Sequence, residues 1–267
     1  MPTLSQLLEV GAHFGHKKER SHPRAKDFVY AIRDSVYVID LEQTLEKLEQ
    51  AIEYLKSQID TGKTVLFVGT KRQAKEAIKK TAESLAMPYI VERWLGGTLT
   101  NFETISKSLK QLVQLEELMK SEEFTKYTKK ERRRIEKKVA RLNALFEGIK
   151  ELKFIPDVLF VVDVAAENVV TSEAKRMNIP IVGICDTNAD PTLINYPIPA
   201  NDDSEKTIKL ILQTIEAGIK GTPVKISKKE SETKPKEDVN LSTELASSEN
   251  EKLEVNLSTP LEAKEEK

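Results

Sequence analysis

Apolar positions along the chain follow two different periods. Short runs in which nearly every residue is apolar are separated by longer stretches in which apolar residues recur every three or four positions. The first pattern predicts strands buried on both faces, and the second predicts amphipathic helices. The expected strands are 34–40, 64–69, 88–92, 156–163 and 179–186, and the expected helices are 41–59, 71–86, 168–178 and 204–219. This alternation predicts an α/β domain with a mainly parallel sheet covered on two sides.

The segment 104–153 interrupts the alternation with two helical stripes. The first stripe is Ile105, Leu109, Leu112, Leu115 and Met119, and the second is Ile135, Val139, Leu142, Phe146 and Ile149. The segment carries 14 Lys plus Arg and 8 Glu, so each stripe is narrow and suits a single partner helix. We therefore expect an inserted antiparallel coiled-coil hairpin that protrudes by ~30 Å. Two helices lying flat on the core are the alternative.

Charge is distributed unevenly, although the net charge is only −1. From Lys228 onward there are 7 Lys against 11 Asp plus Glu, which leaves 35 basic and 32 acidic residues in the rest of the chain. The C-terminal stretch has no aromatic residue and repeats VNLST at 239 and 255. Such a composition cannot offset its ordering entropy by burial, so we expect a disordered acidic tail.

These patterns divide the chain into four expected parts. They are a basic N-terminal arm (1–33), a sheet domain (34–103 and 154–222), the inserted hairpin (104–153) and the acidic tail (223–267). The single cysteine, Cys185, lies in an apolar run and is interpreted as a small core residue. We expect neither a membrane span nor a secretory signal, because no long apolar run and no basic leader occur.

Motifs of nucleotide-dependent and hydrolytic enzymes fail in detail. The triplet GKT at 62–64 resembles the end of a phosphate-binding loop, but Ser57 stands where the loop needs glycine. The stretch VLFVGTKRQA has one glycine where a dinucleotide-binding turn has three. No GxSxG elbow is present. We expect no cofactor, and a nucleotide-binding α/β enzyme without recognisable motifs is kept as the alternative class.

Histidines and carboxylates raise the question of a metal site. All three histidines lie within GAHFGHKKERSHPR, and acidic residues follow the expected strands at Asp163, Asp186, Asp190, Asp202 and Asp203. One interpretation is a cation held by His13, His16, Asp202 and Asp203. The other is that these acidic residues cap turns and helices, and we prefer it because His-x-x-His is a weak zinc signal without further ligands.

Nucleic-acid binding explains more of the sequence. Residues 16–33 carry six basic and two acidic residues, and residues 126–141 carry nine basic and two acidic ones. Such clusters neutralise phosphates and dominate affinity for nucleic acid. Trp94, within ERWLGGTLTNF, either stacks on a base or fills the core, and the core role is preferred. A hairpin that docks another coiled coil is a further alternative.

Five motifs, taken in order, resemble one family. They are GAHFGH, LFVGTKRQA, RWLGGTLTNF, PDVLFVVD, and CDTNADP followed by PIPANDD. Together they span residues 4–222 and resemble the bacterial small-subunit ribosomal protein S-two family. The resemblance implies a flavodoxin-like three-layer domain with a protruding coiled-coil hairpin. It also implies a structural constituent of the small ribosomal subunit with no catalytic activity.

The same resemblance implies partners and contact residues. The family binds 16S-type ribosomal RNA between head and body, neighbours other small-subunit proteins and helps to recruit ribosomal protein S-one. We therefore expect a cytoplasmic, ribosome-bound protein without a membrane or small-molecule partner. Carried over by position, the expected RNA-binding residues are Lys17, Lys18, Arg20, Arg24, Lys71, Arg72, Arg93, Thr98 and Asn101, with Arg132, Arg133 and Arg134 added from the more variable hairpin.

Overall fold

The structure is a computed structural model that describes residues 1–221, and its largest element is a five-stranded parallel sheet. The strands are β4 (Val65–Val68), β5 (Tyr89–Ile90), β6 (Val158–Val162), β7 (Ile181–Cys185) and β8 (Tyr196–Pro199). Side by side they follow the order β5-β4-β6-β7-β8, and every neighbouring pair is parallel. The prediction of an α/β domain with a mainly parallel sheet is confirmed.

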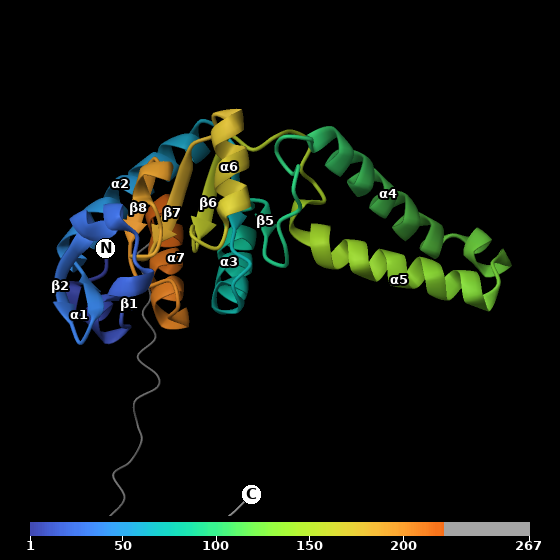
Figure 1. Cartoon of the computed structure of the whole chain (residues 1–267). Coiled ribbons are helices and arrows are strands. Elements are labelled where there is room, and N and C mark those ends of the chain that lie inside the picture. Colours follow the sequence, from blue (N-terminus) through green and yellow to red (C-terminus); the bar gives the residue numbers. More distant parts are fainter. Residues whose placement is uncertain (222–267) are drawn as a thin grey trace, which may run out of the picture. The chain divides into compact units, whose positions relative to one another are not determined.

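Helices cover both faces of this sheet (Figure 1). They are α2 (Leu41–Asp60), α3 (Arg72–Ser84), α6 (Asn168–Met177) and α7 (Glu205–Lys220). Alternate residues of β4 separate two hydrophobic clusters, because successive side chains of a strand point to opposite faces. Phe67 packs with α2, α3 and α7, whereas Leu66 packs on the α6 side. The sheet is therefore the centre of two cores.

Helix starts follow local capping chemistry. The side chain of Asp40 accepts hydrogen bonds from the backbone N–H groups of the first turn of α2. The side chain of Ser204 accepts one from Thr207 N at the start of α7. These bonds satisfy donors that would otherwise have no partner inside the helix. The helices therefore begin close to where the sequence predicts.

The N-terminal segment forms a second, smaller sheet. Its strands are β1 (Phe14–Lys17), β2 (Val29–Arg33) and β3 (Val36–Ile39), which pair antiparallel in the order β1-β3-β2. Asp34 and Ser35 adopt left-handed backbone angles (φ 49° and 64°) and form the tight turn between β2 and β3. The strand expected at 34–40 therefore starts at Val36 and does not join the parallel sheet. The patterning could not reveal β1 and β2, because basic residues surround them.

The segment before β1 packs onto the domain. It begins with α1 (Leu4–Glu9), whose Leu7 is fully buried. Leu7 and Ala12 form a small cluster with Leu41 and Leu210. The backbone carbonyl of Val10 accepts hydrogen bonds from the hydroxyls of Ser204 and Thr207, 3.0 Å each. These contacts hold the first residues against α2 and α7.

One strand, β8, was not predicted. Its sequence, YPIP, contains two prolines, which remove backbone donors and argue against a strand in the middle of a sheet. The strand lies at an edge, where it pairs only with β7 among the described strands. The side chain of Asn195 accepts a hydrogen bond from Ile181 N at 2.9 Å and links the two strands where they begin.

Two long helices form the segment between β5 and β6. They are α4 (Phe102–Lys120) and α5 (Lys129–Phe146), connected by the 3₁₀ turn Glu122–Lys126, and they lie side by side (Figure 1). All ten residues of the two predicted stripes belong to one hydrophobic cluster, which continues to the α6 face of the sheet. A second 3₁₀ turn, Glu147–Ile149, follows α5 and packs on β5.

Gly148 lies in this second turn, directly against Tyr89 of β5. A Cβ atom at position 148 would lie 2.2 Å from the backbone oxygen of Tyr89, so the close approach requires glycine. Within residues 1–221, no helix is both long enough and apolar enough to cross a bilayer. The acidic tail expected at 223–267 lies outside the described residues.

Candidate nucleic-acid interface

The cations expected to bind RNA near the N-terminus differ in exposure and partners. Lys17, Lys18 and Arg20 are exposed, and no ion pair within residues 1–221 involves them. Arg24 is also exposed, but its guanidinium donates to Asp190 at 3.2 Å and to Thr192 at 2.7 Å. The first three are therefore available to an external anion, whereas Arg24 also ties its segment to the connection between β7 and β8.

His16 attaches β1 to the carboxyl edge of the parallel sheet. Its Nδ1 lies 3.1 Å from Asp186 Oδ2, its Nε2 lies 3.6 Å from Asp203 Oδ2, and its backbone N donates to Thr187 Oγ1 at 2.8 Å. The hydrogen bond to Asp186 raises the pKa of His16 above its ordinary value, and burial offsets part of that effect. His16 is therefore an internal anchor of the N-terminal segment.

Lys71 lies at the same edge, after β4, and binds three carboxylates. Its Nζ is 2.7 Å from Asp202, 2.6 Å from Asp203 and 3.0 Å from Asp163. Burial disfavours the charged ammonium, but the hydrogen bonds to Asp202 and Asp203 outweigh it and raise the pKa of Lys71. The structure therefore makes Lys71 an internal ion-pair partner of three carboxylates.

Three carboxylates around one ammonium leave an excess of negative charge. Asp202 is fully buried, and its Oδ2 has no hydrogen-bond partner among the described residues. Burial, together with the charges of Asp163 and Asp186, raises the pKa of Asp202 to about 7. A proton on Asp202 relieves this repulsion.

The edge of the sheet is thus closed to an anionic ligand. In the turn after β4, Thr70 N and Oγ1 both donate hydrogen bonds to Glu167 Oε1, at 3.1 and 2.6 Å. Lys71 of the same turn is paired with the aspartates. A phosphate group placed here would meet the carboxylates of Asp163, Asp202 and Asp203, and this repulsion argues against the nucleotide-enzyme alternative.

The four residues of the possible metal site, His13, His16, Asp202 and Asp203, are not arranged around one point. His16, Asp202 and Asp203 do lie near one another, but Lys71 occupies the space between the two aspartates. The ring of His13 instead lies tilted against Phe14, with centroids 4.0 Å apart, and burial lowers the pKa of His13. Among residues 1–221, no three His, Cys, Asp or Glu side chains are grouped as metal ligands.

The loop that carries RWLGGTLTNF is organised around a buried carboxylate on α6. Glu173 is 6% exposed and accepts five hydrogen bonds. The donors are Trp94 Nε1 (3.1 Å), Gly97 N (2.7 Å), Leu99 N (3.0 Å), Thr100 N (3.2 Å) and Thr100 Oγ1 (3.2 Å). Burial raises the pKa of Glu173, but these bonds outweigh it, so the pKa lies below its ordinary value.

This arrangement settles several expected roles within the loop. Trp94 is 7% exposed and belongs to the core, as preferred from the sequence. Thr98 is 3% exposed and its hydroxyl donates to Leu95 O inside the loop. Arg93 and Asn101 are exposed on either side of the buried part, and Arg72 is exposed at the start of α3.

Sequence reasoning missed Glu173, although a signal was present. Glu173 lies between Val170 and Ala174 on the inward stripe of α6, where an apolar residue is expected. An acidic residue on such a stripe indicates a buried carboxylate, and a buried carboxylate requires donors. Its donors come from a loop more than 70 residues earlier in the chain, and the sequence does not show that pairing.

Cations of α5 form a second exposed basic region. Arg133 and Arg134 are exposed, and within residues 1–221 no ion pair engages either of them. Arg132 is half-buried, and its Nε donates to Tyr127 O at 3.1 Å, so it also supports the turn before the helix. Along α5, the apolar seam faces α4 and leaves these arginines on the surface.

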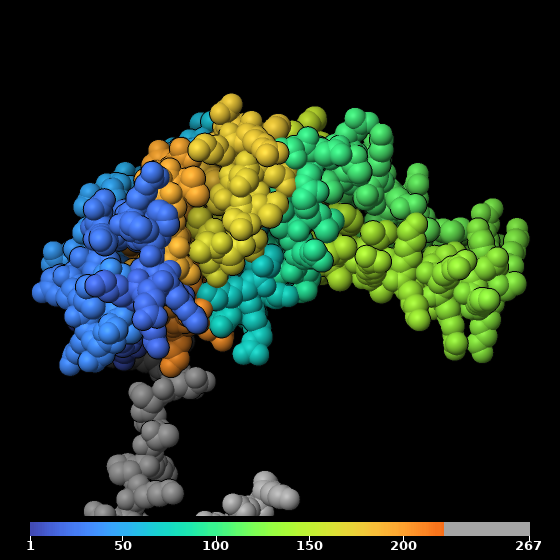
Figure 2. Space-filling view, in the orientation of Figure 1, coloured from blue at the N-terminus to red at the C-terminus, as the bar shows by residue number. Residues whose placement is uncertain are grey.

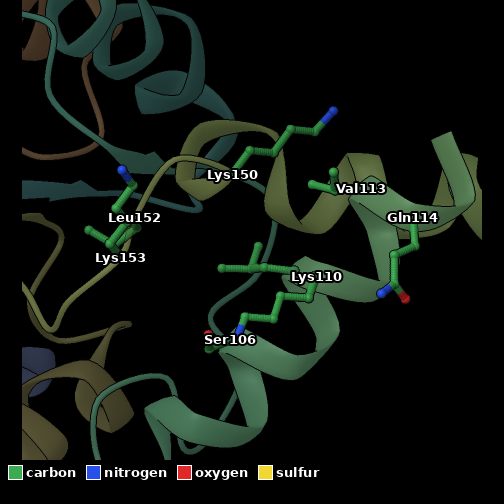
Figure 3. Close-up of a pocket in the computed structure, with 8 residues that line it drawn as sticks. Ser106, Lys110, Val113, Gln114, Lys150, Leu152 and Lys153 are labelled. Carbon is green, nitrogen blue, oxygen red and sulfur yellow. The ribbon is translucent and has the colours of Figure 1, made fainter. Parts of the chain in front are cut away.

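A groove lies between α4 and the chain that follows α5 (Figure 3). Its volume is about 510 Å³, and Lys110, Lys150 and Lys153 contribute to its walls. Lys150 is paired with Glu116 at 2.8 Å, which leaves Lys110 and Lys153 without an ion pair in the described part of the chain. These lysines extend the basic surface toward the sheet domain and were not singled out from the sequence.

The sequence of this chain matches a known protein family. The model of the family described as ribosomal protein S2 matches residues 7–221. The chain belongs to the ribosomal protein S2 family. The small ribosomal subunit protein uS2 of Coprothermobacter proteolyticus is 45% identical over 213 residues, which are 80% of this chain and 80% of that protein.

Other members of the family show similar likeness. The uS2 proteins of Helicobacter acinonychis and of Nitratiruptor sp. are each 42% identical, over 219 and 233 residues. These matches cover 82% and 87% of this chain, and 89% and 87% of the two relatives. The ribosomal protein S2 family is one of structural components and not of enzymes. The side chains at the sheet edge are therefore interpreted as structural.

Proposed function

We propose that this chain is a structural component of the small ribosomal subunit that binds ribosomal RNA between head and body. The observation that carries the proposal is the presence of two separate basic regions whose cations are exposed. Lys17, Lys18 and Arg20 form one, and Arg133 and Arg134 on α5 form the other. Two such regions on one folded chain hold two RNA segments in a fixed relation.

The proposed architecture gives each region its own support. The strand order β5-β4-β6-β7-β8 corresponds to 2-1-3-4-5 among the parallel strands, the flavodoxin-like order, in a three-layer domain. On this domain, residues 104–153 form a protruding antiparallel coiled-coil hairpin, supported by the continuous apolar seam. The remaining proposed parts are the sheet domain at 34–103 and 154–222 and the N-terminal part at 1–33.

Binding rests on phosphate neutralisation and on position. Each cation that replaces a condensed counterion contributes affinity that falls with salt concentration. The proposed contacts are Lys17, Lys18, Arg20, Arg72, Arg93, Asn101, Arg133 and Arg134, with Arg24 and Arg132 in a mixed role. Lys71 and Thr98 are left out, because their polar groups are satisfied inside the protein.

Proteins are also among the proposed partners. The relatives are named as small ribosomal subunit proteins, and neighbouring proteins of that subunit are the natural contacts of an assembled component. We place recruitment of ribosomal protein S-one among the functions of this chain, and a cytoplasmic, ribosome-bound location follows from the same assignment. Binding of purified S-one to small subunits reconstituted with and without this chain tests the recruitment directly.

The salt dependence of RNA affinity tests the proposed RNA contacts. Replacing Arg133 and Arg134 with Ala should reduce the slope of log K against log salt by ~1.4–1.8, since each lost contact contributes ~0.7–0.9. A matched control replaces Lys80 and Lys107 with Ala, which removes two helix-surface cations already paired with Glu76 and Glu103. The control should leave the slope unchanged.

Assembly tests the ribosomal role as a whole. Tagged protein should migrate with free small subunits at low magnesium and with whole ribosomes at high magnesium in sucrose gradients. Protein that stays at the top of both gradients contradicts the proposal. An unchanged salt slope in the Arg133 and Arg134 variant, with normal migration, contradicts only the role of α5.

A further inference from the structure

The small antiparallel sheet has one face that is turned to solvent. Residues directly opposite in an antiparallel pair share a face, so the register defines two rows across the three strands. The first row is Phe14, Val38 and Ala31, and the second is Lys17, Val36 and Arg33. We call these six residues the outer face. The register therefore brings an aromatic ring and two cations onto one surface.

Burial separates this face from its reverse. Phe14 is 54% exposed, and Lys17, Ala31 and Arg33 are also exposed. On the reverse, Tyr37 and Ile39 of the central strand are only 6% and 2% exposed. Figure 2 shows the N-terminal segment, in blue, as part of the molecular surface. The central strand thus turns one side to the core and keeps its other side, with Val38, half-buried, whereas in β2 Ile32 is 53% exposed even on the reverse face.

An irregularity in β1 explains how Phe14 and Lys17 come to face outward together. Three residue steps separate them, whereas their partners Val38 and Val36 are two steps apart, so β1 contains a bulge at Gly15 and His16. The bulge turns His16 inward to Asp186. A Cβ atom at Gly15 would lie 2.7 Å from the methyl group of Thr187, so the strand approaches the domain too closely for a side chain.

The outer face is therefore held rigidly. β1 is fixed by the contacts of His16, and the ring of Phe14 is supported from one side by His13, 4.0 Å away between centroids. A ring that is held in place but exposed loses little conformational entropy when a ligand stacks on it. Phe14 is therefore preorganised for binding a ligand, although its ring is exposed to solvent.

The charges around the face are predominantly positive. Lys17 and Arg33 lie at its two edges, and Lys18 and Arg20 follow Lys17 in the chain, against the carboxylates of Glu19 and Asp34. None of these four cations takes part in an ion pair within residues 1–221. Cations at both edges of a small apolar surface are complementary to phosphates at either side of a base.

We propose that the outer face binds an unpaired nucleotide of RNA, whose base stacks on Phe14 and lies over Val38. Lys17 and Arg33 then contact the phosphates on either side. This inference rests on the proposed RNA-binding function and adds a mode of contact to it. A protein partner is the competing occupant, but a single ring beside two half-buried valines offers little apolar area, and the cations favour a polyanion.

Substitution of Phe14 separates ring stacking from apolar contact. Phe14→Leu keeps apolar bulk and removes the ring, whereas Phe14→Tyr keeps the ring. The probe is an oligouridylate of about 16 nucleotides, single-stranded or paired with its complement. Phe14→Leu should weaken single-strand binding by about 10-fold, because a leucine side chain cannot stack on a base as an aromatic ring does. Phe14→Tyr should bind like the wild type.

Controls make the result specific to this face. Phe154→Leu removes another exposed ring, 80% exposed and outside the small sheet, and should leave binding unchanged. Duplex binding should be the same for wild type and Phe14→Leu. Lys17→Ala combined with Arg33→Ala should lower the salt slope for single strands by ~1.4, whereas Phe14→Leu should not alter it. Unfolding temperatures of the variants should match the wild type.

The outcomes separate this inference from the proposed function. Salt-dependent RNA binding that is equal in wild type and Phe14→Leu overturns the stacking face and leaves the ribosomal role intact. Absence of RNA binding by the wild type overturns both. Normal RNA binding by Phe14→Leu, together with impaired incorporation into small subunits, identifies the outer face as a protein contact and also overturns the proposal.

Discussion

Two buried carboxylates of this molecule are stabilised in different ways. Glu173 is surrounded by five donors that carry no net charge, all from the loop between β5 and α4. Asp202 shares the single ammonium of Lys71 with Asp163 and Asp203. The pKa of Glu173 is held below its ordinary value, whereas the pKa of Asp202 is raised to about 7.

This difference shows that the pKa of a buried carboxylate depends on how many acceptors share each donor, and not only on the charge of the donors. Each donor at Glu173 serves one acceptor, and both carboxylate oxygens are satisfied. At Lys71 one cation serves three acceptors, and one oxygen of Asp202 has no partner among the described residues. Dedicated neutral donors therefore lower the pKa of Glu173, whereas the shared ammonium of Lys71 does not offset the burial of Asp202 and the charges of Asp163 and Asp186.

The largest effect is expected from removing the shared cation. Lys71→Met leaves Asp163, Asp202 and Asp203 without their common partner and should lower the free energy of unfolding by about 3–5 kcal/mol. Urea unfolding at neutral pH measures the change. Lys75→Met is the matched control, because its ion pair with Glu92 is exposed and should cost below ~1 kcal/mol. Equal losses in both variants contradict the role assigned to Lys71.

A smaller loss of stability is expected from changing Glu173, whose five donors are uncharged. Glu173→Gln keeps the shape of the side chain but replaces one carboxylate oxygen with an NH2 group, so that the donors on that side lack an acceptor. The free energy of unfolding should fall by about 2–3 kcal/mol. The tryptophan fluorescence should also shift, because Trp94 Nε1 loses an ionised acceptor. Glu76→Gln, at an exposed position on α3, should change neither quantity.

The two carboxylates, Asp202 and Glu173, should also change stability with pH in opposite directions. Asp202 binds its proton more tightly in the folded state, so stability falls by up to ~1.4 kcal/mol per unit as pH rises toward about 7. The raised pKa of His16 acts in the same direction, since its contribution is lost as pH rises through that value. The lowered pKa of Glu173 contributes stability above its ordinary value of 4.5, which is lost on further acidification.

Asp202→Asn isolates the first of these contributions. The variant keeps a neutral side chain at every pH, so its free energy of unfolding should depend less on pH between about 5 and 7 than that of the wild type. Unfolding in urea at several pH values across this window gives both curves. If the two curves run parallel, Asp202 does not titrate there.

Much of the fold could be predicted because its strands are buried on both faces. Every residue of β6 and of β7 is buried, and such continuous apolar runs identify central parallel strands without ambiguity. The strand β8 was missed because its prolines argue against a strand and its edge position tolerates them. The antiparallel strands β1 and β2 were missed because their exposed residues resemble a basic loop.

The sequence allowed us to predict which segments carry exposed cations, but not which cations form ion pairs inside the protein. Exposed cations such as Lys18 and Arg133 lie where the sequence predicts, since charged residues of an amphipathic or irregular segment face water. Lys71 looks the same in sequence, but it follows the buried strand β4 and meets Asp163, which follows β6, and Asp202 and Asp203, which follow β8. Convergence of strand ends is a property of the sheet topology, which one sequence does not reveal residue by residue.

The chain enters and leaves the α4–α5 segment beside the same short strand. The loop after β5 leads into α4, and the turn after α5 returns Gly148 to within contact of Tyr89 in β5. Neighbouring entry and exit points mean that material can be added or removed between them in whole helical turns without moving β4 or β6. In evolutionary terms the α4–α5 segment is an insertion whose length can change while the parallel sheet domain stays the same.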